Sequence, residues 1–261
     1  MAVNDLSAPS ALIIAHPGHE LRLHGWVARV KPAVFVLTDG SGHTGKSRLD
    51  STTATLNEVG AEPGCIYGRL TDKALYAAVL DHNFEVFIEL TEELARALVR
   101  NRVACVAGDA MEGYNPSHDI CRVIANAAVK LASRASGHEI GNFDFLLAGR
   151  PDSCPGGSRD SAVCLHLDSQ ELNHKLAAAR RYTELFTDVN EALGRWGEES
   201  FQTECLRPAG DGDEQGLEVP PFYEGYGEKQ VENGYYASVL RYREHFLPVA
   251  EAIRRHVEGK V

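Results

Sequence analysis

Two histidines at the end of an apolar run are the first residues in the chain that could do chemistry. They lie in the sequence Ala11-Leu-Ile-Ile-Ala-His16-Pro-Gly-His19-Glu20. The apolar run predicts a buried parallel strand, and ligands of open α/β sheets bind just beyond the carboxyl ends of such strands. Two imidazoles three residues apart on a turn can converge on one cation, so the pattern indicates a metal site.

A third ligand is expected from His118. The apolar run Val103–Ala107 predicts another strand, and the segment Gly108-Asp109-Ala-Met-Glu112-Gly113-Tyr114-Asn115-Pro116-Ser117-His118-Asp119 leads from it into a predicted helix. A catalytic zinc site needs three protein ligands and one open position. We therefore expect His16, His19 and His118 to bind Zn²⁺ or another divalent metal. The alternative is that His118 is an ordinary polar residue in a first helical turn that Ser117 or Asp119 caps.

A glycine-rich loop offers a different chemistry. The segment Gly40-Ser-Gly-His-Thr-Gly45-Lys46-Ser47 satisfies the P-loop pattern between a predicted strand and a predicted helix. Backbone N–H groups in such a loop bind phosphates, so a nucleotide-binding enzyme is one alternative function. No convincing strand that ends in a Walker-B aspartate accompanies it. A further possibility is that this loop, with His43, contacts an anionic part of a substrate.

Strand-like runs alternate with helix-like runs, which indicates βαβ units. We expect strands at Leu12–Ala15, Ala33–Thr38, Cys65–Tyr67, Phe84–Leu90, Val103–Ala107, Phe143–Leu147 and Ala162–Leu167, and helices at His19–Val30, Lys46–Val59, Thr91–Val99, Asp119–Ser133 and Glu171–Phe186. The predicted fold class is α/β, with a Rossmann-like, mostly parallel sheet of about five to seven strands and helices on both faces.

The C-terminal third has a different composition. Residues 193–226 are rich in Gly, Pro and acidic residues, so we expect an irregular excursion there. Residues 235–257 predict a C-terminal helix that is interrupted near Pro248. The chain shows no internal repeat and no low-complexity tract, so we expect residues 1–261 to form a single domain.

Composition limits the possible partners and the compartment. The net charge of −11 argues against a nucleic-acid partner, because phosphate binding needs a basic face. No apolar run is long enough to span a membrane, and the first residues do not resemble a secretion signal. We therefore expect a cytoplasmic protein that acts on a small molecule and could form a homo-oligomer. The six cysteines include no Cys-x-x-Cys pair and are expected to be reduced core residues.

The motifs together resemble the PIG-L/LmbE-like zinc-dependent deacetylases, which act on N-acetylglucosamine-type sugars. Where that family has Ala-His-Pro-Asp-Asp-Glu, this chain has Ala15-His16-Pro17-Gly18-His19-Glu20. The family's Thr-Asp-Gly matches Thr38-Asp39-Gly40, and its Glu-Gly-Gly-His-Pro-Asp-His-Asp matches Glu112-Gly113-Tyr114-Asn115-Pro116-Ser117-His118-Asp119. The order and spacing agree from about Ala11 to Asp119, and a weaker similarity extends into the tail.

The resemblance implies a metal site with altered proton-transfer groups. The family's three metal ligands fall on His16, His19 and His118, so an aspartate ligand is replaced by a histidine. The family's general base falls on Gly18, which cannot transfer a proton. Its distal His–Asp pair falls on Asn115 and Ser117, of which Asn115 can still donate a hydrogen bond to an oxyanion.

Two carboxylates are candidates to replace the missing base. Glu112 lies on the same loop as His118, and Asp39 follows the second predicted strand. Arg48 is expected to help place the substrate. The implied activity is hydrolysis of a C–N amide bond in an N-acetylated amino sugar or a sugar conjugate. If nothing replaces the base, the alternative is a catalytically impaired protein that binds a metal and a sugar or other metabolite.

Overall fold

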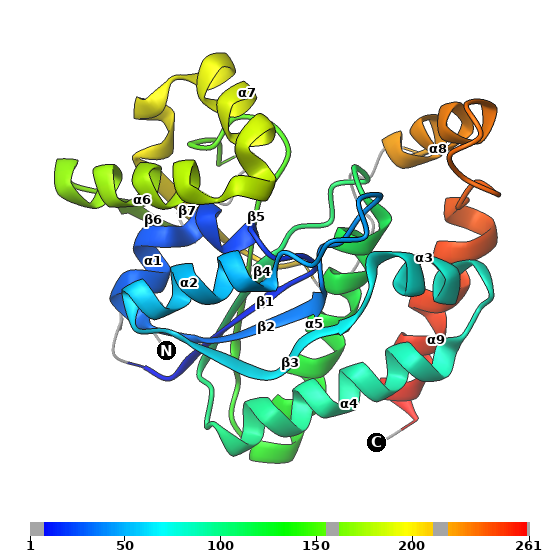
Figure 1. Cartoon of the computed structure of the whole chain (residues 1–261). Helices are drawn as coiled ribbons and strands as arrows, with labels where there is room; N and C mark the ends of the chain where they lie inside the picture. Colours follow the sequence, from blue (N-terminus) through cyan, green and yellow to red (C-terminus); the bar gives the residue numbers. More distant parts are fainter. Residues whose placement is uncertain (1–7, 155–161, 211–218, 260–261) are drawn as a thin grey trace.

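A central β-sheet organises the structure, a computed structural model that describes residues 8–154, 162–210 and 219–259 (Figure 1). Within these ranges the sheet has seven strands in the order β3-β2-β1-β4-β5-β7-β6. The strands are β1 (Ser10–Ile14), β2 (Ala33–Thr38), β3 (Glu62–Leu70), β4 (Cys105–Asp109), β5 (Gly141–Phe145), β6 (Val163–His166) and β7 (Thr203–Pro208). Strands β1 to β5 run parallel, and β7 pairs antiparallel with both β5 and β6.

The helices cover both faces of the sheet, as expected from the alternating pattern. They are α1 (His24–Val30), α2 (Leu49–Val59), α3 (Asp72–Leu80), α4 (Phe84–Arg100), α5 (Pro116–Ser136), α6 (Ser169–Arg181), α7 (Phe186–Trp196), α8 (Phe222–Glu232) and α9 (Leu247–Glu258). Figure 1 shows α1 and α2 on one face and α4, α5 and α9 on the other. The α/β fold class predicted from the sequence is therefore confirmed, with a mostly parallel sheet.

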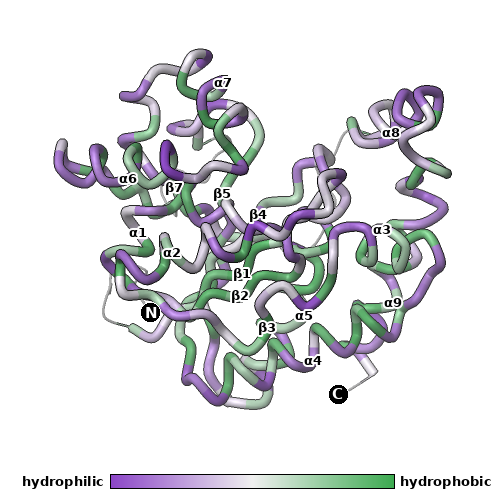
Figure 2. Tube along the Cα trace, viewed as in Figure 1, coloured by the Kyte–Doolittle hydropathy of each residue, from purple (hydrophilic) through white to green (hydrophobic). Residues whose placement is uncertain are grey.

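Alternation along β1 explains the two layers of core. Leu12 and Ile14 pack with Trp26 of α1 and Leu56 of α2, whereas Ile13 faces the cluster formed by α4, α5 and α9. Successive side chains of a strand point to opposite faces, so a strand that is covered on both faces is apolar throughout. Figure 2 shows this as an unbroken hydrophobic trace through β1 and β2, with hydrophilic segments on the outer helices.

The strand order has a reversal point beside β1. Strand β1 pairs with β2 on one side and with β4 on the other. The chain therefore adds β2 and β3 on one side of β1 and later adds β4 and β5 on the opposite side. Ligands of open α/β sheets bind at the carboxyl ends of the strands at such a point. The segments that follow β1 and β4 carry the predicted metal ligands and meet there.

Three sequence-based expectations about secondary structure were wrong. Phe84–Leu90 is the first part of α4 and not a strand, because Phe87, Leu90, Leu94 and Leu98 are buried at helical spacing. The segment 193–226 contains β7, a short strand between β5 and β6 whose mixed sequence carried no visible pattern, and residues 211–218 lie outside the described part. The tail is helical only from Tyr242 and not from Tyr235: a π-helix over Tyr242–Phe246 passes into α9 at Leu247, so the helical geometry does change next to Pro248, which lies in the first turn of α9, where proline is favoured.

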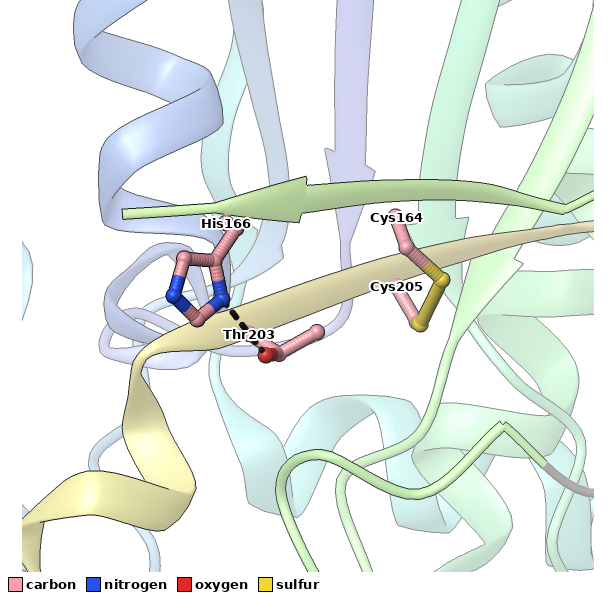
Figure 3. Close-up of a disulfide and its surroundings, with 4 residues drawn as sticks. All are labelled: Cys164, His166, Thr203 and Cys205. Atoms are coloured by element: carbon pink, nitrogen blue, oxygen red, sulfur yellow. Dashed lines mark hydrogen bonds between the residues drawn. A yellow bond between two sulfur atoms is a disulfide. The ribbon is translucent and has the colours of Figure 1, made fainter. Parts of the chain in front are cut away.

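A disulfide joins the two outer strands. Cys164 of β6 and Cys205 of β7 face each other across the antiparallel pair and are bonded to one another (Figure 3). The sulfur of Cys154 lies within 4.8 Å of both. The expectation of reduced cysteines is therefore wrong for Cys164 and Cys205, whereas Cys65, Cys105, Cys121 and Cys154 are free. The sequence contained no spacing signal for this pair, since the two residues are brought together by the strand register.

Within the described ranges, no helix combines the length and the apolar character needed to cross a lipid bilayer.

Candidate metal centre

The turn after β1 brings His16 and His19 to the edge of the sheet. Gly18 has a φ of +105°, which residues with a side chain rarely adopt, and it turns the chain into the 3₁₀-helix His19–Leu23. The backbone N–H of Leu21 donates to the carbonyl of Gly18 at 3.2 Å. Both histidines are consequently carried on a short, fixed turn beyond the strand.

His118 reaches the same place from the segment after β4. It lies in the first turn of α5, which Asn115 caps by accepting a hydrogen bond from the Ser117 N–H at 2.9 Å. The Asp119 carboxylate accepts hydrogen bonds from the N–H groups of Glu112 and Gly113, and this closes the loop back onto the helix. The cap predicted as an alternative for this segment exists, but Asn115 supplies it and the His118 ring remains directed to the sheet edge.

The three imidazole rings meet. Ring centroids are 5.3 Å apart for His16 and His19, 5.1 Å for His16 and His118, and 4.6 Å for His19 and His118. An imidazole bound through one nitrogen at about 2.1 Å has its centroid about 3.2 Å from the zinc, so two rings at tetrahedral angles are about 5 Å apart. The spacing of the ring centroids is therefore that of three histidines around one tetrahedral ion, but among the described residues the three ligand atoms that all lie within 4.8 Å of one another belong to Cys154, Cys164 and Cys205 and not to these rings.

The partner of His19 fixes which nitrogen faces the centre. Its Nδ1 lies 3.0 and 2.9 Å from the two carboxylate oxygens of Asp109, which is the last residue of β4. One of these oxygens also accepts the backbone N–H of Ala15 at 2.8 Å. A carboxylate beside Nδ1 holds the proton there and leaves the Nε2 lone pair free for a cation.

His16 is held in the same way by two groups. Its Nδ1 lies 2.8 Å from the Thr38 hydroxyl and 3.0 Å from a carboxylate oxygen of Asp72, the first residue of α3. Thr38 donates its own hydroxyl proton to the carbonyl of Ala15 at 3.0 Å, so its oxygen is an acceptor for His16. Both partners accept a proton from Nδ1, and the Nε2 of His16 is again the free nitrogen.

The electrostatics favour a neutral ring at His19 and at His118. Burial lowers the pKa of His19 below its usual value, although the Asp109 carboxylate raises it. Burial also lowers the pKa of His118 well below its usual value, and the neighbouring His19 and His16 add to this effect. Burial alone would raise the pKa of Asp72, but the hydrogen bond and charge of His16 lower it below its usual value. Neutral imidazoles flanked by carboxylates are the protonation state that a divalent cation requires.

The two candidate bases, Glu112 and Asp39, both accept hydrogen bonds from groups of the protein itself. The Glu112 carboxylate accepts the backbone N–H groups of Leu147 and Ala148 at 2.7 to 3.1 Å, and burial raises its pKa. The Asp39 carboxylate accepts both the N–H and the hydroxyl of Ser41 at 3.0 and 2.6 Å. Both carboxylates therefore already take part in local structure, although the bonds to Asp39 use only its Oδ1 atom.

Arg48 and His43 occupy different positions. The Nε of Arg48 donates to the carbonyl of Gly40 at 2.5 Å, and the charge of the guanidinium acts on His19 and His118. His43 is exposed in the glycine-rich loop, and the structure gives it no contact with the three ligands. The structure thus brings the charge of Arg48, but not the side chain of His43, to the centre.

The position of the family's general base is filled by an apolar side chain. A Cβ atom on Gly18 would lie 2.4 Å from Cδ1 of Leu185, which precedes α7. Behind the turn, Glu20 accepts the Gly18 N–H at 2.7 Å and the Thr52 hydroxyl at 2.9 Å. Burial raises the pKa of Glu20 to about 7. Its carboxylate supports the turn from behind.

The glycine-rich loop uses its amides internally. The Gly42 N–H donates to the Asp72 carboxylate at 2.6 Å, and the Ser41 N–H donates to Asp39. In a phosphate-binding loop such N–H groups point at the anion, and a carboxylate beside them repels it. Lys46 is exposed, and α2 begins only at Leu49. The loop instead holds one oxygen of the Asp72 carboxylate, whose other oxygen lies at His16 Nδ1.

Two residues that contact the histidines, Asp109 and Asp72, were not predicted from the sequence. Asp109 lies within the quoted motif, and its place at the end of a predicted strand beside His16 was a usable signal. Asp72 follows Thr71, which caps α3 by accepting the Ala74 N–H at 3.0 Å, so its type is common for a first helical turn. Its approach to His16 depends on the crossover from β3 and could not be predicted.

Comparison with solved structures finds deacetylases. The zinc inhibited form of teicoplanin deacetylase Orf2 matches with a TM-score of 0.52 and 14% identity, over 76% of this chain and 97% of that chain. The antimicrobial reagent A40926 pseudoaglycone deacetylase Dbv21 matches with a TM-score of 0.53 and 18% identity, over 78% of this chain and 97% of that chain. No protein-family model and no curated protein sequence matches the chain. The resemblance to the deacetylase family indicated by the motifs is therefore confirmed at the level of the fold.

Proposed function

We propose that this protein is a divalent-metal-dependent hydrolase of C–N amide bonds that removes the acetyl group of an N-acetylated amino sugar. The observation that carries the proposal is the convergence of three imidazoles, two of them with Nδ1 held by a carboxylate. The deacetylase activity of proteins with the same fold supports the reaction class.

The donor set fits zinc. Three neutral imidazoles, with no anionic ligand among them, leave the full charge of the ion at the site and one position open. When bound, the ion would polarise the acetyl carbonyl and lower the pKa of a water molecule. His16, His19 and His118 would hold it, and Asp72 and Asp109 would keep the rings oriented.

The remaining residues would position and stabilise the substrate. The guanidinium of Arg48 supplies a positive charge near the histidines, which favours an oxygen that becomes negative during amide hydrolysis. Asn115 uses its side-chain oxygen on the Ser117 N–H, so its amide N–H₂ group is available as a donor beside His118. Glu112 is the candidate base on the same loop, and it would exchange its contacts with Leu147 and Ala148 for that role.

Metal analysis and deacetylation together test this proposal. Purified protein is expected to contain about one zinc per chain and to release acetate from N-acetylglucosamine or its glycosides. His118→Ala should lose both, whereas the exposed His138→Ala, which lies at the far end of α5, should lose neither. Protein that contains no zinc after reconstitution, and is stabilised against heat by ATP in a manner that depends on Lys46, would contradict the metal site and favour the nucleotide-binding alternative.

A second candidate function is metal and sugar binding without turnover. It is favoured by the packing at Gly18, since Leu185 occupies the space of the family's base, and by the hydrogen-bonded state of Glu112 and Asp39. Protein that binds zinc and an N-acetyl amino sugar but releases no acetate would support this function. Loss of acetate release in Glu112→Gln with zinc retained would instead support hydrolysis with Glu112 as the base.

A further inference from the structure

Three of the six cysteines converge beside the two outer strands of the sheet. Cys164 lies on β6, Cys205 lies on β7, and Cys154 lies in the loop that follows β5. Their sulfur atoms all lie within 4.8 Å of one another. The three residues come from three separate segments, and the proposed function uses none of them.

Backbone contacts place the third sulfur. Arg22 donates a hydrogen bond to the carbonyl of Gly149 at 3.3 Å, and this holds the chain after β5 against the 3₁₀-helix that follows β1. The Ser153 N–H donates to the carbonyl of Arg150 at 3.1 Å and closes a turn directly before Cys154. Cys154 is half-buried and free, so the fold and not a bond to its sulfur brings it to the disulfide.

The spacing of the sulfurs suits a metal ion. Three sulfurs that bind one zinc ion at about 2.3 Å and at tetrahedral angles are about 3.8 Å apart. All three pairs of sulfurs lie within 4.8 Å, and the Cα atoms of Cys164 and Cys205 are 4.4 Å apart. Once the bond between these two residues is opened, rotation of the side chains therefore brings the three sulfurs to the distances that one ion requires.

The donor atoms of this group are sulfur alone. His166 lies two residues after Cys164 on β6, but its Nδ1 lies 3.3 Å from the Thr203 hydroxyl, and its ring is not part of the compact group (Figure 3). Thiolates favour thiophilic ions such as Zn²⁺ and Cu⁺, whereas Mg²⁺ and Ca²⁺ prefer oxygen ligands. Three thiolates leave a fourth position of a tetrahedral ion open to an exchangeable ligand.

The group also has a path to solvent. Cys164 is exposed, whereas Cys205 is only 8% exposed and packs against the protein. One exposed ligand gives an ion access to the site, and one buried ligand gives it a fixed wall.

We propose that Cys154, Cys164 and Cys205 form a thiolate site for a thiophilic metal ion, which the disulfide blocks. A dithiol reductant supplies two electrons and two protons to the bond between Cys164 and Cys205, and is itself oxidised to a disulfide. The two new thiols and the thiol of Cys154 then each release a proton when the ion binds. The disulfide and the ion exclude one another, because a sulfur in a disulfide carries no thiolate charge. This site is separate from the three histidines and does not depend on the proposed function.

Metal titration of protein reduced with a phosphine tests the proposal. His118→Ala is the background, because it removes one of the three histidines of the candidate metal centre. Zn²⁺ is titrated against a competing chelator, and Co²⁺ is added because cobalt–thiolate charge-transfer absorption distinguishes sulfur ligands from imidazole ligands. The reduced protein is expected to bind about one more ion per chain than the oxidised protein. Elemental analysis of protein purified under reducing conditions identifies whether the ion it carries is zinc or copper.

Cysteine variants locate the site. Cys154→Ser is expected to lower the zinc affinity of the reduced protein by at least about tenfold, because one of three thiolates is lost. When oxidised, this variant should still form the disulfide between Cys164 and Cys205, which requires β6 and β7 to pair and therefore reports on the fold. Cys65→Ser is the matched control, because Cys65 is a free, exposed cysteine on β3, at the opposite edge of the sheet. This control should leave the affinity unchanged.

The outcomes separate this site from the proposed function. A cobalt–thiolate band that is lost in Cys154→Ser would support the site, whether or not the protein releases acetate. Reduced protein that shows no such band, or that binds zinc equally well with and without Cys154, would overturn the proposal. Acetate release by protein whose three sulfurs bind no ion would support the hydrolase and contradict only this site.

Discussion

The carboxylate of Asp109 faces Nδ1 of His19 with both oxygens, at 3.0 and 2.9 Å, from the last position of the strand beside β1. The contact connects the two segments that meet at the reversal point of the sheet. In the proposed metal site, this contact would supply from behind His19 the negative charge that an aspartate ligand would carry.

Asp109→Asn is expected to weaken zinc binding by about 10- to 100-fold, because the amide no longer holds the Nδ1 proton with a negative charge. Competition with a chromophoric chelator would measure the dissociation constant. Asp81→Asn, an exposed change beyond α3, is the control and should leave the affinity unchanged. Equal zinc affinities of the wild type and Asp109→Asn would show that Asp109 does not support a metal ligand.

Gly18→Asp restores the residue type of the related deacetylases at the base position, yet it is expected to destabilise the fold by about 2–4 kcal/mol. Its φ of +105° is unfavourable for aspartate, and its Cβ would lie 2.4 Å from Leu185. Gly45→Asp is a matched control, because Gly45 has a φ of +69° and no atom within 4 Å of an added Cβ. Urea unfolding would compare the two, and equal losses would mean that Leu185 yields without cost.

Lys175→Met is expected to cost about 3–5 kcal/mol of folding free energy. Glu204 of β7 accepts hydrogen bonds from Lys175 at 2.8 Å and from the Gly25 and Trp26 N–H groups of α1, and both charged side chains are buried. Removing Lys175 leaves the carboxylate without its cation. The control is Arg255→Met, which breaks an exposed pair with Glu251 and should cost less than about 0.5 kcal/mol. Similar losses for both variants in urea unfolding would contradict this assignment.

His24 is expected to make the fold less stable in acid. Burial lowers the pKa of His24 below its usual value, although the charge of Glu204 raises it. Between the lower native pKa and the usual pKa of the unfolded chain, the unfolded chain therefore binds more protons than the native chain. The free energy of unfolding should therefore fall as the pH falls through about 6.5, and its contribution is complete above that value. His24→Gln should reduce this pH dependence relative to the wild type in urea unfolding between about pH 5.5 and 7.5. The exposed His138→Gln should retain it.

Much of the fold follows from periodicity and order along the chain. Buried strands such as Ala33–Thr38 and the long helix after Asn115 carry strong apolar patterns, and the parallel sheet follows from their alternation. Strand β7 does not, because antiparallel pairing with two neighbours can be satisfied by a short and mixed sequence such as Thr203–Pro208. The pairing of Cys164 with Cys205 depends on the register of β6 against β7 and could not be predicted from the sequence either.

The candidate metal centre was predictable in part for a similar reason. His16, His19 and His118 follow strands, and carboxyl ends of neighbouring parallel strands necessarily meet. No such rule predicts which residues of other elements lie next to these histidines and their turn. Asp72 reaches His16 from the start of α3, and Leu185 reaches Gly18 from the turn before α7. Both contacts depend on how helices outside the central strands are seated.

The disulfide between β6 and β7 encloses the segment that carries α6, α7 and Leu185. The disulfide limits how far this segment can move away from the sheet. It also reduces the conformational entropy that the chain loses when the segment packs onto the sheet. Reduction of one bond at the outer edge would therefore loosen the segment that supplies the apolar neighbour of Gly18. The disulfide and the turn that carries His16 and His19 are thus connected through the peptide segment that contains Leu185.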